Sequence, residues 1–318
     1  MMDYKADLLQ RYWKYHETQF ANKQALFDPR YIKPASPPVF TRCQAWRNVI
    51  INPNANLKEI DQLLDLVPDG ERHKWFRSMN SSQALAQSVL GNLAINDSLH
   101  YLSEIKDDEG MDLFGKAQIS SDNFAMEYKV NYLGEPHSRS TSLDGYVSGD
   151  YRIAIECKFI ETEVGPCSHA KSTSKNPKPP CDGTYSMQGG KERCLLTERK
   201  RKYWQYVPQL FEWKSDSDLF PCPLNKNYQL VRNVLAVGVK PDGTVSANNG
   251  HVILIYDERN PAFLEGGDGL IAYEETRIAL RKPTMLRKCS WQRIVQYLRE
   301  QNILPWLTEN LALKYGIQ

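Results

Sequence analysis

Three acidic side chains and a lysine fall on neighbouring short segments near the middle of the chain. They are Glu127, Asp144, Glu156 and Lys158. In segment 151–159, apolar residues alternate with polar ones, so Glu156 and Lys158 share one face of a predicted half-buried antiparallel strand. Carboxylates with a lysine beside them can hold a divalent cation and act on a phosphate.

Two predicted hairpins would bring the acids together. Ser, Gly and Asp at 148–150 suit a chain reversal, and a hairpin centred there places Asp144 opposite Glu156, with Cβ atoms about 5 Å apart. Two carboxylates at that distance repel each other unless a cation lies between them. We therefore predict a Mg²⁺ site there, with Mn²⁺ as an alternative, because both prefer oxygen ligands. A second hairpin would bring Glu127, from the predicted strand 124–132, to the same patch.

The competing interpretation is a solvated strand face. An exposed Glu-x-Lys pair on a strand is more often that than a site. Here Asp144 faces Glu156 with a third acid nearby, which costs energy without a ligand, so we favour a functional patch.

Asp144, followed after eleven residues by Glu156-Cys157-Lys158, resembles the D-x(n)-ExK signature of the PD-(D/E)XK nuclease superfamily. Leu143 stands before Asp144 where the signature has Pro. The core of that superfamily runs helix, three strands, helix, strand. The chain offers these elements in the same order, at 81–94 (helix), 124–132, 140–147 and 151–160 (strands), 226–237 (helix) and 251–257 (strand).

The resemblance implies an α/β (α+β) fold with a restriction-endonuclease-like core. Its mixed central sheet would have about four to five strands flanked by helices, with helical additions at both ends. We expect an N-terminal helical extension at 1–79, the core at 80–260 with a long loop at 161–192, and a C-terminal helical segment at 261–318 packed on the core.

The resemblance also implies a function: a metal-dependent DNA nuclease, most simply an endonuclease, that hydrolyses phosphodiester bonds with a metal-activated water. Asp144, Glu156 and the backbone carbonyl of Cys157 would hold the metal, and Glu127 would complete the site. Lys158 would position the nucleophile or offset charge on the phosphate. Relatives often carry a polar residue, frequently Gln, on the second core helix, which makes Gln229 a further catalytic candidate.

Residues for nucleic-acid contact are predicted in three places. Ser82 and Gln83 lie near the start of the first core helix, where backbone amides favour an anion, although simple capping is the alternative. Arg232 lies on the second core helix. The basic run Arg199, Lys200, Arg201 and Lys202 precedes Tyr203, Trp204 and Tyr206, a composition that suits phosphate contact and base stacking, or else a solvated basic helix face. The expected partner is double-stranded DNA, with RNA left open, and the sequence is compatible with a homodimer.

Composition sets the remaining limits. The 318 residues are 41% apolar and 25% charged, with a net charge of +2 and no long apolar run, so we expect a cytoplasmic globular protein with no membrane partner. Seven cysteines without a secretion signal argue against a disulfide framework. Cys167, Cys181, Cys194 and Cys222 could bind Zn²⁺, although they include no C-x₂-C pair and the competing interpretation is scattered reduced thiols.

Two other functions remain open on these grounds. One is a catalytically inactive nucleic-acid-binding module of the same fold. The other is a zinc-stabilised interaction protein.

Overall fold

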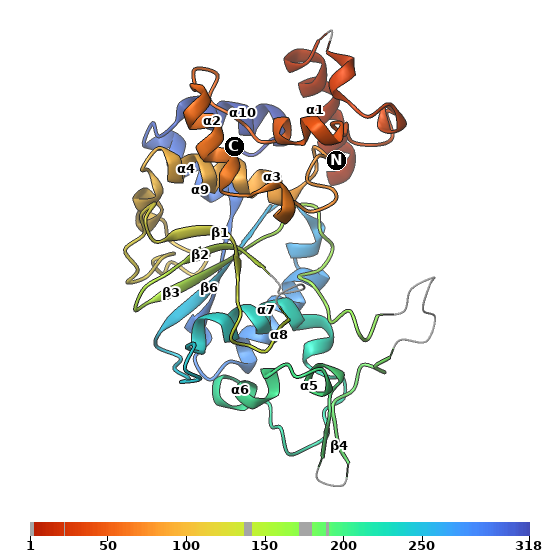
Figure 1. Cartoon of the computed structure of the whole chain (residues 1–318), viewed down its shortest axis with the longest axis vertical. Helices are drawn as coiled ribbons and strands as arrows, with labels where there is room; N and C mark the ends of the chain where they lie inside the picture. The colour runs from red at the N-terminus through yellow and green to blue at the C-terminus, as the bar shows by residue number, and fades with distance from the viewer. Residues whose placement is uncertain (1–2, 22, 137–141, 172–179, 189–190) are drawn as a thin grey trace.

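The centre of the molecule is a mixed β-sheet of five strands in the order β1-β2-β3-β6-β7 (Figure 1). It belongs to a computed structural model that describes residues 3–21, 23–136, 142–171, 180–188 and 191–318. The strands are β1 (Phe124–Lys129), β2 (Ser142–Val147), β3 (Arg152–Cys157), β6 (Gly250–Tyr256) and β7 (Leu286–Ser290). A two-stranded hairpin outside this sheet consists of β4 (Ser186–Gln188) and β5 (Lys191–Arg193).

The register of the sheet brings the acidic positions into line. Strands β1, β2 and β3 form an antiparallel meander, and β6 and β7 continue the sheet in parallel pairs. Gly145 pairs with Ile155 across β2 and β3, so continuing the register by one residue sets Asp144 opposite Glu156. Gly145 also pairs with Met126 across β1 and β2, which sets Glu127 opposite Asp144. The predicted register of the hairpin centred near residue 150 is confirmed, and the second hairpin brings Glu127 next to Asp144 as expected.

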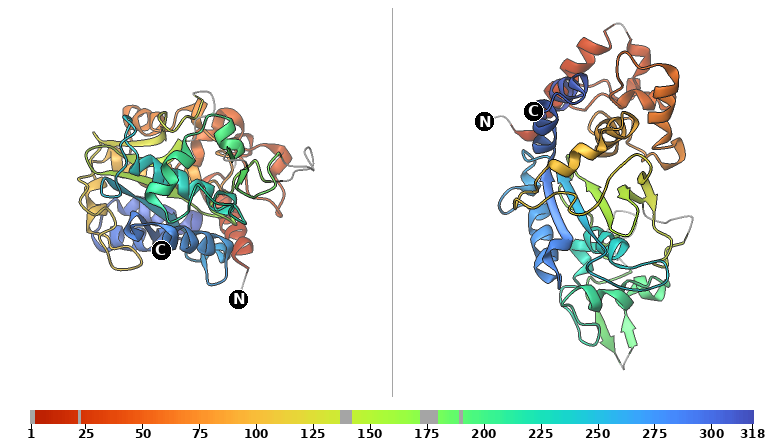
Figure 2. Two further views of the ribbon diagram at one scale, coloured as in Figure 1. Left: turned by 90° about the horizontal axis from the view of Figure 1, so that it is seen from below. Right: turned by 90° about the vertical axis from the view of Figure 1, so that its left-hand side faces the viewer.

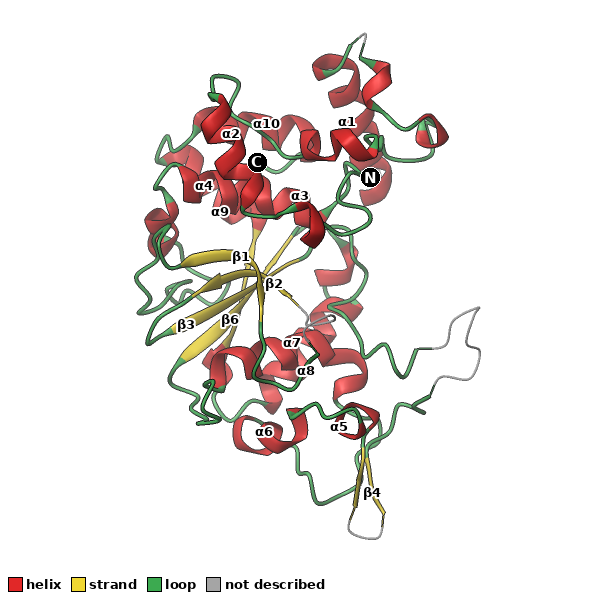
Figure 3. Cartoon of the chain, viewed as in Figure 1, coloured by secondary structure: helices red, strands yellow, loops and turns green. Residues whose placement is uncertain are grey.

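Helices cover both faces of the sheet (Figures 1 and 3). One face packs against α1 (Tyr4–Gln19), α3 (Ser82–Ala86), α4 (Asn92–Ile95), α9 (Trp291–Glu300) and α10 (Pro305–Tyr315), with α2 (Leu57–Asp65) outside α4. The other face packs against α6 (Tyr203–Leu210), α7 (Leu224–Gly238) and α8 (Asp268–Ala279), beside the short α5 (Leu195–Glu198). This confirms the predicted mixed α/β class, with its five-stranded mixed sheet and helices at both ends.

The first predicted core helix is continuous from α3 to α4 but contains a π-helical segment, Gln87–Gly91. Ser81 caps its start by accepting the backbone N–H of Ala84. A Cβ at Gly91 would lie 2.8 Å from Leu63 Cδ1, so the missing side chain lets α2 pack closely. The sequence pattern located this helix but did not reveal the π-helical segment.

Three local predictions are corrected by the structure. Strand β3 is buried on both faces rather than half-buried, because α7 covers the face that carries Glu156. Residues 286–290 form strand β7, not part of a C-terminal helix. The predicted loop 161–192 includes β4 and the start of β5, while its residues 172–179 and 189–190 lie outside the described chain. Residues 140 and 141 of the predicted strand 140–147 lie outside it as well.

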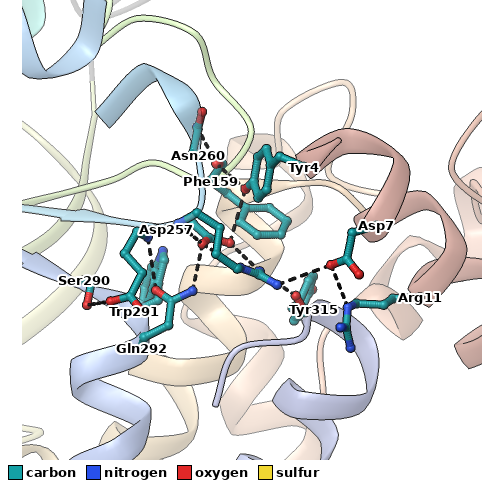
Figure 4. Close-up of polar contacts among 12 residues, drawn as sticks. Tyr4, Asp7, Arg11, Phe159, Asp257, Asn260, Ser290, Trp291, Gln292 and Tyr315 are labelled. Carbon is teal, nitrogen blue, oxygen red and sulfur yellow. Dashed lines mark hydrogen bonds and ion pairs between the residues drawn. The ribbon is translucent and has the colours of Figure 1, made fainter. Parts of the chain in front are cut away.

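A buried polar network ties both ends of the chain to the sheet (Figure 4). The Tyr4 hydroxyl donates to the Phe159 carbonyl at 2.9 Å and lies 3.2 Å from Asp257 Oδ2. Arg259 donates to Asp257 Oδ2 at 2.6 Å and to the Tyr315 carbonyl at 2.7 Å. Because Phe159 directly follows Lys158, this network holds the backbone at the end of β3 that carries the candidate site.

The two ends of the chain also meet each other. Helices α1 and α10 are in contact and share one hydrophobic core with the sheet (Figure 2). The proposed division into 1–79, 80–260 and 261–318 stays a prediction. In the described parts of the chain, no helix is long and apolar enough to cross a membrane.

Candidate active site

A cleft of about 920 Å³ opens at the end of β3, between the sheet and the start of α3. All of the predicted acids and the lysine line it, together with Gln229 from α7. Its remaining lining comes from Ser142 and from segments 31–39, 71–83 and 157–162. The chain therefore gathers residues from distant parts of its sequence around one acidic patch.

Glu156 is the most fully buried of the acids, with 1% of its surface exposed. Its Oε1 accepts the Gln229 amide at 2.6 Å and lies 2.8 Å from Lys158 Nζ. Its Oε2 accepts the Asn233 amide at 2.8 Å, with an Arg232 nitrogen 4.0 Å away. Buried carboxylates need such partners, and here both oxygens have them.

Asp144 lies between the two other acids in the sheet register. Its Oδ2 accepts the backbone N–H of Cys157 at 2.6 Å, which fixes the side chain against β3. Burial raises the pKa of Asp144 well above its usual range, and the charges of Glu156 and Glu127 raise it further. The protein therefore bears an electrostatic cost at Asp144 that a cation would relieve.

Glu127 reaches this patch through an unusual backbone. Its φ of 48° is in the left-handed region, which a non-glycine residue in a strand adopts only under strain. One carboxylate oxygen accepts the Gln83 amide at 2.6 Å and the other accepts the Ser142 hydroxyl at 2.5 Å. Burial raises the pKa of Glu127, and the neighbouring Glu156 adds to the increase, against the lowering effect of these two hydrogen bonds. Strain of this kind is often found at functional sites.

Lys158 contributes a positively charged side chain to the cleft. Its Nζ lies 3.1 Å from Gln229 Oε1 as well as 2.8 Å from Glu156. Burial acts to lower the pKa of Lys158, but the charges of Glu156, Glu161 and Asp144 outweigh it and raise the pKa above its usual value. Lys158 is therefore protonated at neutral pH and can act as a proton donor or a positive charge.

Gln229 links Glu156 to Lys158, donating to one and accepting from the other. Its position depends on Gly165, whose carbonyl accepts the Gln229 backbone N–H at 3.1 Å. Gly165 has φ of 109°, and a Cβ there would lie 2.0 Å from Gln229 Oε1. Only glycine fits at this position, so loop 161–171 and α7 are matched to each other.

Four residues of the site were not predicted from the sequence as site residues: Ser142, Glu161, Gly165 and Asn233. Asn233 could have been found, because it lies one helical turn after Gln229 on the same face of α7. Glu161 accepts the Ser82 hydroxyl at 2.6 Å and lines the cleft, but its sequence context shows no pattern.

The cleft offers several oxygen ligands for a divalent cation. Carboxylate, amide and carbonyl oxygens are the ligands that Mg²⁺ prefers. Burial and neighbouring carboxylates raise the pKa values of Asp144 and Glu127, so a positive charge beside these two groups would be favourable. Nevertheless, among the described residues no group of three or more His, Cys, Asp and Glu side chains is arranged to hold a metal ion as it stands. Both Glu156 oxygens already accept hydrogen bonds, so a cation would have to share Glu156 with Lys158 and Gln229. The chemistry fits Mg²⁺, and the geometry requires side-chain adjustment.

The residues predicted to bind nucleic acid occupy three different environments. Ser82 and Gln83 line the cleft, but their side chains bond Glu161 and Glu127. Arg232 is 1% exposed and contacts the Ser142 carbonyl, so we reassign it from nucleic-acid contact to support of the site.

The basic run at 199–202 lies between α5 and α6, away from the cleft lining. Arg199, Lys200 and Lys202 are exposed. The aromatic residues that follow, Tyr203, Trp204 and Tyr206, are buried and pack in the core, so the predicted base stacking there is wrong.

Aromatic surface at the cleft comes instead from Trp75 and Tyr31. Trp75 is 38% exposed, its ring makes an edge contact with Tyr31, and Lys74 Nζ lies 5.2 Å from the ring. Both rings line the cleft, as does His73. An exposed tryptophan beside a lysine is a suitable surface for a nucleobase and a phosphate.

Comparison with known proteins gives one match. The family model described as "Restriction Endonuclease associating with ARP" matches residues 14–316, nearly the whole chain. No curated protein and no solved structure matches the chain.

Proposed function

The chain belongs to the family of restriction endonucleases associating with ARP, and from this premise we propose that it is a metal-dependent DNA endonuclease of the PD-(D/E)XK type. Family membership supports a nuclease-related role for the chain. The observation that carries the finer proposal is the sheet register, which sets Glu127, Asp144 and Glu156 side by side, with protonated Lys158 in the same cleft.

Asp144 and Glu156 would hold the metal, with the Cys157 carbonyl and Glu127 as further ligands. When bound, Mg²⁺ or Mn²⁺ would lower the pKa of a water molecule and place a positive charge next to phosphate oxygens. The Cys157 N–H keeps Asp144 directed at this position through its 2.6 Å hydrogen bond. The left-handed backbone of Glu127 allows its carboxylate to join the other two.

Lys158 carries the proton and the positive charge in the proposed mechanism. Its ammonium group can donate to a phosphate oxygen or to the attacking water once substrate fills the cleft. Gln229 holds that ammonium at 3.1 Å, and Asn233 takes over part of the Glu156 charge at 2.8 Å. Fixing these donors before substrate arrives lowers the cost of reorganisation during the reaction.

We propose double-stranded DNA as the substrate. The cleft of about 920 Å³ accommodates a backbone segment, and Trp75 supplies an aromatic surface at its wall. Arg199, Lys200 and Lys202 are exposed and could contact phosphates further along a bound duplex.

A second candidate is a DNA-binding module of the same fold that does not cleave. One observation favours it: both Glu156 oxygens are satisfied by Gln229, Lys158 and Asn233 without a metal ion. The complete set of Asp144, Glu156 and Lys158 favours the nuclease.

Cleavage of circular and linear DNA with Mg²⁺ tests the proposal. Asp144→Asn is the test variant, and Asp150→Asn is its matched control because Asp150 is an exposed residue of the turn between β2 and β3. We expect wild type and Asp150→Asn to cut circles and Asp144→Asn to fail. Degradation of linear DNA alone would indicate an exonuclease, and binding without cleavage by wild type would favour the non-cleaving module.

A further inference from the structure

Four of the seven cysteines lie together, outside the lining of the acidic cleft. Cys167, Cys181, Cys194 and Cys222 line one small pocket of about 10 Å³, roughly one water-sized sphere. Each is separated from the next by at least a dozen residues, so the chain has to fold back repeatedly to collect them. The other residues that line this pocket include no Asp, Glu or Lys. All seven cysteines are free thiols.

One backbone donor is directed at a thiol of this group. Gly183 N–H donates to the sulfur of Cys181 at 3.4 Å. An amide donor directed at sulfur stabilises a thiolate, and metal ligands are typically held by such bonds.

Backbone hydrogen bonds hold together the segments that carry Cys167, Cys181 and Cys222. Cys167 N–H donates to the Asn225 carbonyl at 2.9 Å, Cys181 N–H to the His169 carbonyl at 3.1 Å, and Cys222 N–H to the Gly183 carbonyl at 2.8 Å. Three of the cysteines are buried and the fourth, Cys181, is half-buried. Scattered reduced thiols have no reason to share one small pocket.

We propose that Cys167, Cys181, Cys194 and Cys222 form a structural Zn²⁺ site. Four cysteine thiolates around one position are the ligand set of a structural, tetrahedral zinc site. The described side chains do not form a finished metal site, so binding requires the four sulfurs to close on the space between them. This proposal does not rest on the nuclease activity, because the cysteines do not line the acidic cleft.

The site would fix the mutual position of three segments. Cys167 and Cys181 belong to the loop after β3, Cys194 directly precedes α5, and Cys222 lies just before α7. That loop also carries Gly165, against which Gln229 of α7 is fitted. Zinc would thus hold α7 and the loop in the alignment that Gln229 needs.

Metal content of the full-length protein tests the proposal. Protein purified under reducing conditions and passed over a chelating column should retain about one zinc per chain by mass spectrometry. Cobalt substitution should give the intense sulfur-to-metal charge-transfer absorption of a tetrahedral thiolate site. Wild type with neither zinc nor this absorption would overturn the proposal.

Variants distinguish the cluster from adventitious binding. Cys181→Ser and Cys194→Ser should reduce zinc content to background, whereas Cys43→Ser, at an exposed cysteine outside the cluster, should leave it unchanged. The cobalt spectrum of wild type decides the matter even where a serine variant does not fold. Equal zinc content in Cys194→Ser and wild type, or two disulfides among the four cysteines in the reduced preparation, would contradict the site.

Discussion

Replacing Asp144 with Asn should abolish cleavage and at the same time stabilise the metal-free protein. The substitution removes the central charge of a row of three acids, while the amide oxygen of Asn can still accept the Cys157 N–H. A functional site that binds a cation is expected to store this kind of repulsion, whereas a structural carboxylate would not.

The magnitude follows from the spacing of the strands. Opposed residues have Cβ atoms about 5 Å apart, and two unit charges at that distance repel by about 3 kcal/mol at an effective dielectric constant of about 20. Lys158 offsets part of the repulsion from Glu156, and the hydrogen bonds from Gln83 and Ser142 offset part of the charge of Glu127. We therefore expect Asp144→Asn to raise the free energy of unfolding by about 1–3 kcal/mol at pH 8.

The pH dependence provides a second signature. Because the pKa of Asp144 is raised on folding, the folded state binds more protons than the unfolded state between its ordinary value of 3.8 and the raised value. Wild-type stability should therefore fall as pH rises through this window, and the advantage of Asp144→Asn should grow across it and vanish near pH 4.

Urea unfolding, followed by tryptophan fluorescence with and without Mg²⁺, measures both effects. Mg²⁺ should stabilise wild type, by about 2.7 kcal/mol at a hundred times its dissociation constant, and leave Asp144→Asn nearly unchanged. A variant that is less stable than wild type at pH 8 without metal would refute the argument, because Asp144 would then be a structural residue. Asp150→Asn, with its exposed side chain, is the control.

Three further perturbations have distinct expected outcomes. Gly165→Ala would push Gln229 out of place, so single-turnover cleavage should fall about 10–100-fold while the free energy of unfolding falls only about 1–2 kcal/mol. Unchanged cleavage would contradict the close fit between Gly165 and Gln229. Burial lowers the pKa of Lys314 to about 7, so stability should rise with pH between 7 and 10.5, by at most about 5 kcal/mol, and urea unfolding of Lys314→Met should lack this slope. The double variant Lys200→Gln, Lys202→Gln should bind DNA more weakly and with a log–log salt slope about 2 smaller in fluorescence anisotropy, and an unchanged slope would remove the basic run from the DNA-binding surface.

The strand pairing around the site was predictable because its signals are local. Alternation along β3 and the turn residues at 148–150 fix the register, and the register sets Asp144 opposite Glu156. The fully apolar β6 was equally visible as a buried strand. In contrast, β7 is only five residues long, contains Arg287 and Lys288, and leads directly into α9, so helical periodicity dominated the prediction.

The parts that could not be predicted depend on tertiary contacts. Arg232 looked like a surface cation, but its side chain is buried. There it donates hydrogen bonds to the Ser142 carbonyl and to the side-chain oxygen of Asn233. The left-handed backbone of Glu127 has no sequence marker, since it depends on contacts with Gln83 and Ser142.

The gathering of four distant cysteines likewise depends on the path of loops between strands. No local spacing such as C-x₂-C announces it. The sequence therefore offered the zinc site only as an alternative.

We propose that Lys158, held by Glu156 and Gln229, acts in metal-dependent DNA cleavage. Single-turnover cleavage of circular DNA by wild type and Lys158→Met, combined with calorimetric Mg²⁺ titration of both proteins, tests it most directly. The variant should cleave at least about 100-fold more slowly and yet bind Mg²⁺ with an affinity within a few-fold of wild type. Equal cleavage by the two proteins, or no cleavage by either, would contradict it.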